Sequence, residues 1–198
     1  TSTKEFNLHL DGLTGLRLWS AEDPQLYHVV VRQKDSHGKE EMVFSTLYGF
    51  RQIEQRGALV YINGQRIYFK GVNTQDTHPV TGRTMTVATM LEDVKMMKQS
   101  NMNTVRTSHY PPVNEYLDLA DEYGLYVIDE TGDEAHATEW ISNDDRFLGM
   151  YQERVRRMVL RDRNHACVLF WSAGNESGEV EAPDFFSCKL CGNFVCGD

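Results

Sequence analysis

The sequence has little basic charge and no long apolar run. Its 198 residues carry 20 Lys and Arg against 29 Asp and Glu, a formal net charge of −9. The basic surface that recognises nucleic acid is missing, so we expect no nucleic-acid partner. No run of about 20 apolar residues is present, so we expect no membrane span. Residues 1–8 show no basic and apolar leader pattern, and the compartment stays open between cytoplasm and periplasm.

A complete set of zinc ligands is lacking too. Three of the four cysteines, Cys188, Cys191 and Cys196, lie within the last eleven residues, with no histidine close by. Structural zinc sites usually take four ligands. We therefore interpret residues 181–198 as a divergent tail and not as a metal site.

The first fifty residues have a β pattern without helical periodicity. Tyr27–Val31 is a strand candidate followed by turn residues at Asp35–Gly38, and Met42–Phe50 is a second candidate. Successive strands without helices between them favour part of a sandwich. A hairpin follows, in which residues 58–62 and 65–70 flank Asn63-Gly64, a pair that suits a type I′ turn.

Beyond the hairpin, strand and helix patterns alternate. We predict strands at residues 67–71, 104–107, 125–129 and 167–172, with helices at about 86–100, 116–123 and 147–159. Gly124 fits the C-terminal cap of the second helix. Such repeats predict a parallel α/β fold amounting to about half of a (β/α)8 barrel. A doubly wound sheet is the alternative, although no G-x-G-x-x-G follows the first strand.

Polar residues gather directly after each predicted strand. They are Asn73, Asp76 and His78, then Arg106, Ser108 and His109, then Asp129, Glu130, Glu134 and His136, and finally Asn175 and Glu176. The carboxyl ends of barrel strands form the active-site face, so these residues are expected to converge on one pocket. The pattern predicts an enzyme.

Each candidate also has a plainer interpretation. Glu176 suits a general acid in a partly buried pocket, or it is an ordinary loop glutamate. Glu134 and His136, two apart, suit Mg²⁺ or Mn²⁺ better than zinc when joined by another carboxylate, or belong to a solvated acidic loop. His78 and His109 donate to substrate hydroxyls or bond local backbone. Arg106 needs a charged partner, catalytic or structural.

Several ordered motifs resemble glycoside hydrolase family 2, especially its β-galactosidase branch. The matching stretches are LWSAEDPQLY at 18–27, NGQRIYFKGVN at 63–73, MMKQSNMNTVRTSHYP at 96–111, YGLYVIDE at 123–130, RDRNH at 161–165 and WSAGNESG at 171–178. Ala166 departs from the family's usual proline, and after Gly178 the likeness stops.

The resemblance implies a domain plan and roles for single residues. Residues 1–50 correspond to the C-terminal part of an immunoglobulin-like sandwich, and residues 51–180 to the N-terminal half of a catalytic barrel. Glu176 takes the place of the general acid/base, and Glu134, His136 and Glu176 match the ligands of a magnesium ion. The remaining matches are to substrate-binding residues, namely Asn175, His78, His109 and Arg106.

The implied activity is that of a retaining glycosidase acting on terminal β-D-galactosides, in a homo-oligomeric parent enzyme. A retaining mechanism needs a second, attacking carboxylate, which has no counterpart in the matched stretches, so we expect little turnover from the isolated chain. The alternatives are a non-catalytic fragment or carbohydrate-binding remnant, and a sibling β-glucuronidase or β-mannosidase.

Overall fold

A four-stranded parallel sheet organises the larger part of the molecule. The structure is a computed structural model that describes residues 7–141 and 144–177. The sheet contains β6 (Gly71–Thr74), β7 (Thr104–Thr107), β8 (Tyr126–Glu130) and β9 (Val168–Ser172), and its helices are α1 (Val87–Gln99), α2 (Asn114–Tyr123) and α3 (Asp145–Asp162). The strands pair in sequence order, all parallel. This order is that of a barrel segment, whereas a doubly wound sheet reverses its order at a switch point.

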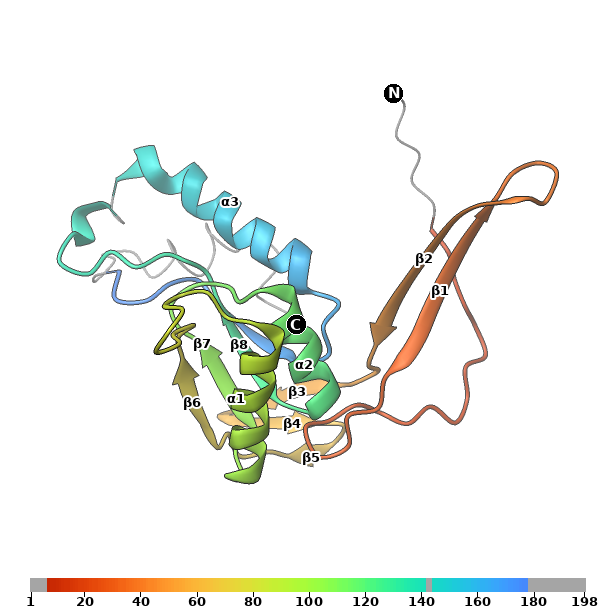
Figure 1. The fold of residues 1–198 in the computed structure, drawn as a ribbon, viewed down its shortest axis with the longest axis horizontal. Coiled ribbons are helices and arrows are strands. Elements are labelled where there is room, and N and C mark those ends of the chain that lie inside the picture. Colours follow the sequence, from red (N-terminus) through yellow and green to blue (C-terminus); the bar gives the residue numbers. More distant parts are fainter. Residues whose placement is uncertain (1–6, 142–143, 178–198) are drawn as a thin grey trace.

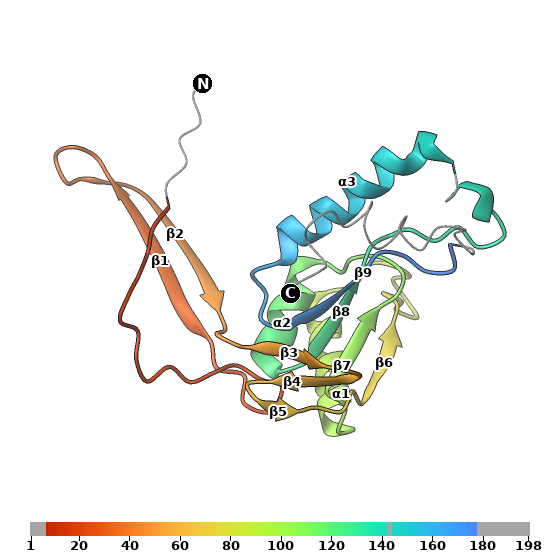
Figure 2. The same cartoon turned by 180° about the vertical axis from the view of Figure 1, so that it is seen from behind.

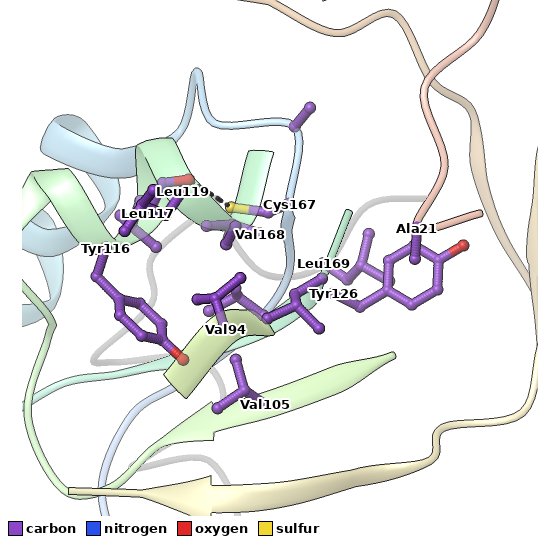
Figure 3. Packing of buried hydrophobic residues seen from close by; sticks show 14 of the residues in the cluster. Ala21, Val94, Val105, Tyr116, Leu117, Leu119, Tyr126, Cys167, Val168 and Leu169 are labelled. Carbon is purple, nitrogen blue, oxygen red and sulfur yellow. Dashed lines mark hydrogen bonds between the residues drawn. The ribbon is translucent and has the colours of Figure 1, made fainter. Parts of the chain in front are cut away.

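The apolar core lies between the parallel sheet and the helices that cover it. Val94 of α1, Leu117 of α2, Val105 of β7 and Val127 of β8 are all fully buried in one cluster. Figure 3 shows this packing, with Cys167 beside Leu117 at the start of β9. This packing attaches the sheet to the helices and so fixes the positions at which its strands end.

Two smaller sheets precede the parallel one. Strands β1 (Tyr27–Lys34) and β2 (Glu40–Tyr48) form an antiparallel pair that projects away from the α/β part (Figure 1). Strands β3 (Ile53–Arg56), β4 (Leu59–Ile62) and β5 (Gln65–Arg66) form a sheet at the N-terminal ends of the parallel strands (Figure 2).

The predicted Asn63-Gly64 turn and Gly124 cap are confirmed, and the structure adds an N-terminal cap at Thr86. Asn63 and Gly64 join β4 to β5 with φ angles of 52° and 77°, both positive as a type I′ turn requires. Thr86 caps α1, because its hydroxyl accepts from the Thr89 amide at 3.2 Å. Gly124 ends α2 in the left-handed conformation, with φ of 76°.

The first parallel strand was predicted too early, at residues 67–71, and runs instead over Gly71–Thr74. The cause is the side chain of Asn103, the residue directly before β7. The Asn103 amide donates to the Tyr68 carbonyl at 2.9 Å, and its oxygen accepts from the Lys70 amide at 2.8 Å. These bonds take the place of a strand ladder before Gly71. Strands β8 and β9 each begin one residue later than predicted.

None of the described helices has the length and apolar character needed to cross a membrane.

Candidate active site

The candidate residues collect where β7, β8 and β9 end. The loops after β8 and β9 continue side by side, because Glu134 and Asn175 form an isolated parallel bridge. The Asn175 amide donates to the Asp133 carbonyl at 2.9 Å. Figure 1 shows both loops leaving the same end of the sheet. The expected convergence at the carboxyl ends of the strands is therefore present for the loops after β8 and β9.

Glu130, the last residue of β8, is the centre of the hydrogen-bond network. It is fully buried, with 0% exposure. Its Oε2 accepts from Arg106 Nε at 2.6 Å and from Ser172 Oγ at 2.7 Å, and Oε1 lies 2.7 Å from His109 Nδ1. Its own backbone amide donates to Thr107 Oγ1 at 3.0 Å. One buried carboxylate thus joins side chains from β7, β9 and the loop after β7.

Arg106 carries this network to the predicted site residues. Its Nη2 donates to Asn175 Oδ1 at 2.8 Å, and the Asn175 Nδ2 then donates to Glu134 Oε1 at 3.3 Å. The charged partner expected for Arg106 is therefore Glu130. The chain of contacts runs from a buried ion pair to an amide and on to a carboxylate of the β8 loop.

His136 and Glu176 meet at the outer end of the site. His136 Nδ1 contacts Glu176 Oε2, and the side chains are 69% and 57% exposed. Among the described residues, Glu176 is therefore exposed and does not lie in the partly buried pocket that was expected for it. Glu176 also adopts a positive φ of 46°. This conformation is uncommon for a residue with a side chain.

The predicted metal ligands are only partly assembled. His136 and Glu176 are in contact, and Glu134 accepts a hydrogen bond from Asn175, the residue before Glu176. Two carboxylates and an imidazole are donors that suit Mg²⁺ or Mn²⁺. Among the described residues, however, the set of three ligand-type side chains found within 4.8 Å of one another lies elsewhere. The residues fit the ion in type, and Glu134 has to turn toward the other two to hold it.

The cluster within that limit is Asp121, His165 and Cys167. Both Asp121 oxygens already accept at 2.7 Å, one from the Cys167 amide and one at His165 Nδ1. Burial raises the pKa of the Cys167 thiol well above its usual value, and Sγ donates to the Leu117 carbonyl at 3.6 Å. A metal needs the thiolate. The cluster is therefore a structural tie between α2 and the start of β9.

The two predicted histidines have different surroundings. His109 contacts Glu130, follows a cis Ser108–His109 peptide bond, and so belongs to the network. His78 Nδ1 instead accepts from the Thr81 amide at 3.2 Å, within a loop closed by a bridge to Gly82. The local-backbone interpretation describes the contacts of His78, and its role in substrate binding stays a prediction.

Two models of protein families match the chain. The model for the TIM barrel domain of glycosyl hydrolases family 2 matches residues 53–187, and a second family 2 model matches residues 2–51. The chain belongs to glycosyl hydrolase family 2. The predicted fold class, the first half of a (β/α)8 barrel after the end of a sandwich domain, is therefore confirmed.

Curated relatives of the chain include bacterial β-galactosidases. The chain is 44% identical over 172 residues to the β-galactosidase of Yersinia enterocolitica, with 84% of the chain and 16% of the relative covered. It is 44% identical over 177 residues to that of Pectobacterium atrosepticum, with 87% of the chain and 17% of the relative covered. The chain therefore spans about one sixth of the length of these relatives.

Solved structures similar to the chain include β-glucuronidases. A Ruminococcus gnavus β-glucuronidase in complex with a C6-substituted uronic isofagomine has a TM-score of 0.76 and 29% identity over 81% of this chain and 27% of its own. The Bifidobacterium dentium β-glucuronidase complexed with coumarin-3-O-glucuronide has the same TM-score and identity, over 80% and 26%. Both likenesses support the family 2 fold.

Two residues of the network had no specific role assigned from the sequence: Glu130, which was named only among the strand-end polar residues, and Ser172. A signal for Glu130 existed, because Arg106 needed a charged partner. Arg106 pairs in register with Ile128, and Glu130 lies two residues further along the same strand. Ser172 offered no comparable signal, since a serine at a strand end is compatible with many roles. The C-terminal cysteines Cys188, Cys191 and Cys196 lie outside the described residues.

Proposed function

We propose that this chain supplies the acid/base half of the active site of a retaining glycoside hydrolase that cleaves terminal β-D-galactosides. The observation that carries the proposal is the convergence of Asn175 and Glu176 with the residues of β7 and β8. The Glu176 side chain is exposed, so a leaving-group oxygen can approach it. Asn175, held by Arg106, offers an amide beside the same point.

In this mechanism Glu176 protonates the leaving oxygen and later removes a proton from the attacking water. His136 contacts Glu176 and so orients the carboxyl group that donates the proton. Glu134, His136 and Glu176 would hold a Mg²⁺ ion, whose positive charge would influence the ionisation of the nearby carboxylates.

A β-glucuronidase is the second candidate, because β-glucuronidases are among the similar structures. A uronic acid substrate carries a carboxylate that needs a positively charged partner. Within the described part of the chain, the guanidinium that contacts the site residue Asn175 is that of Arg106, and it already contacts the buried Glu130. That pairing favours a neutral sugar such as galactose over a uronic acid at this part of the site.

The test is a hybrid enzyme in which residues 16–177 replace the matching segment of a related β-galactosidase. We expect hydrolysis of β-galactosides in preference to β-glucuronides. Glu176→Ala should lower kcat/KM by about 10²–10⁴-fold for a substrate with a poor leaving group. The loss should be much smaller for an activated aryl galactoside, because its leaving group needs no proton.

The matched control is Glu92→Gln, which changes an exposed glutamate on α1. It should leave both substrates unaffected. Equal losses for the two leaving groups in Glu176→Ala would contradict the acid/base role. A preference for glucuronides in the unaltered hybrid would instead favour the second candidate.

A further inference from the structure

We propose that Glu130 is a positioning residue whose buried carboxylate fixes Arg106 and His109 and, through Arg106, sets the orientation of Asn175. The functional meaning of this inference rests on the proposed function. Its structural content rests on contacts among β7, β8 and β9 alone.

The oxygens of Glu130 are fully engaged by protein groups. Oε2 receives Arg106 Nε at 2.6 Å, Arg106 Nη2 at 2.5 Å and Ser172 Oγ at 2.7 Å, while Oε1 lies 2.7 Å from His109. The side chain is 0% exposed. Glu130 therefore has no oxygen directed at a substrate, and it acts through the groups it holds.

A carboxylate is the side chain that this environment requires. An ionised carboxylate only accepts hydrogen bonds, and every Arg106 nitrogen only donates. A glutamine at the same position would have one oxygen and one NH₂ group for the same neighbours. With its oxygen toward Arg106, its NH₂ group would face His109 Nδ1, which would then have to accept a hydrogen bond in place of the contact it makes with Glu130. The charge of Glu130 also neutralises Arg106 where both side chains are largely buried.

Through Arg106, Glu130 fixes the orientation of the Asn175 side-chain amide. Arg106 Nη2 lies between Glu130 Oε2 and Asn175 Oδ1, at 2.5 and 2.8 Å. Because the guanidinium donates, the Asn175 oxygen faces it, and Nδ2 is left to face Glu134 at 3.3 Å. The amide is thereby presented as a hydrogen-bond donor beside the predicted acid/base residue. Without the Glu130 charge, Arg106 is no longer held in place, and the Asn175 amide loses this fixed orientation.

The experiment is NMR spectroscopy of the complete 198-residue chain and its Glu130→Gln variant. The reporters are the Arg106 Nε–H signal and the side-chain NH₂ signals of Asn175. In Glu130→Gln we expect the Arg106 signal to lose its slow solvent exchange and both Asn175 signals to shift. The control is Glu54→Gln, which removes the charge from an exposed pair with Arg56 and should move neither reporter. Unchanged Asn175 signals in a folded Glu130→Gln chain would overturn the inference.

A second variant keeps the test decisive if Glu130→Gln does not fold. Ser172→Ala removes one hydrogen bond to Oε2 and leaves the Glu130 charge in place. The Arg106 and Asn175 signals should shift in this variant too, by a smaller amount. No shift in either signal would contradict a shared anchor at Oε2.

A Mn²⁺ titration separates this inference from the proposed function. Neighbours that orient metal ligands change affinity by about 10–100-fold when altered. We therefore expect Glu130→Gln to raise the Mn²⁺ dissociation constant at least about tenfold, by way of Asn175 and Glu134. If the unaltered chain binds no Mn²⁺, the metal part of the proposed function fails. The Asn175 signals then still decide the role of Glu130.

Discussion

Glu130 at the end of β8 contacts Arg106 of the adjacent β7 through two guanidinium nitrogens, at 2.6 Å to Nε and 2.5 Å to Nη2. The Glu130 side chain has 0% exposure and that of Arg106 has 28%. The pair lies at the boundary between the apolar core and the polar residues of the site. Removing one member of this pair costs more stability than removing one member of an exposed pair such as Arg56 with Glu54, because the remaining charge is buried without a partner.

Arg106→Ala should therefore lower the free energy of unfolding by about 3–5 kcal/mol. The double variant Arg106→Gln with Glu130→Gln should lose less than the sum of its single variants, since no charge then remains buried. Urea unfolding at neutral pH measures Arg106→Ala, the double variant and its two single variants. Arg56→Ala, at the exposed pair, should change stability by less than about 1 kcal/mol. Strictly additive losses at Arg106 and Glu130 would contradict the coupling.

Two glycines should respond in opposite directions to alanine. A Cβ at Gly71, the first residue of β6, would lie 2.2 Å from the Thr104 carbonyl oxygen of the adjacent β7. Backbone cannot yield cheaply there, so Gly71→Ala should destabilise by at least about 1–3 kcal/mol through overpacking. A Cβ at Gly149, within α3, meets no atom within 4 Å. Gly149→Ala should stabilise by about 0.5–1 kcal/mol. Thermal unfolding of both variants checks the contrast.

Asp129 should make stability fall as the pH rises. Burial, then the neighbouring Asp162 carboxylate, raises the pKa of Asp129 from its ordinary 3.8 to about 8. Between these values the folded chain keeps a proton that the unfolded chain has lost, so the free energy of unfolding decreases with pH. Asp129→Asn should flatten this slope and raise stability by at least about 1 kcal/mol at pH 8.

The measurement is urea unfolding at several values from pH 5 to pH 8. Asp11→Asn, at an exposed position in the N-terminal segment, is the control and should keep the slope of the unaltered chain. An equal slope in Asp129→Asn would show that Asp129 does not hold the extra proton.

Local signals in the sequence predicted the parts of the fold that depend on neighbouring residues. The Asn63-Gly64 turn and the Gly124 cap each follow from the conformational preferences of one or two residues. The start of β6 was misplaced because Asn103, more than thirty positions away from Tyr68, occupies the backbone groups before it. Periodicity within one segment carries no information about such a bond.

The site shows the same division between local and distant causes. Strand-end position selected Arg106, Asn175 and Glu176, since this rule needs only the order of elements. The role of Glu130 depends on the register of β7 against β8 and on Ser172 arriving from β9. The exposure of Glu176 likewise depends on what surrounds the loop, which the residues near it in sequence do not determine.

The last prediction concerns the ion expected at Glu134, His136 and Glu176. The unaltered chain should bind Mn²⁺ and Mg²⁺ at one site, and a chelator should remove the ion without unfolding the α/β part, whose core packs independently of these loops. His136→Ala should weaken Mn²⁺ binding at least about tenfold because it deletes a direct ligand. His28→Ala alters an exposed histidine of β1 and should have no effect. Calorimetric titration measures the affinities, and paramagnetic broadening by Mn²⁺ locates the ion. Broadening centred on Asp121 and His165 instead of His136 would place the ion at the wrong cluster and remove the magnesium assignment.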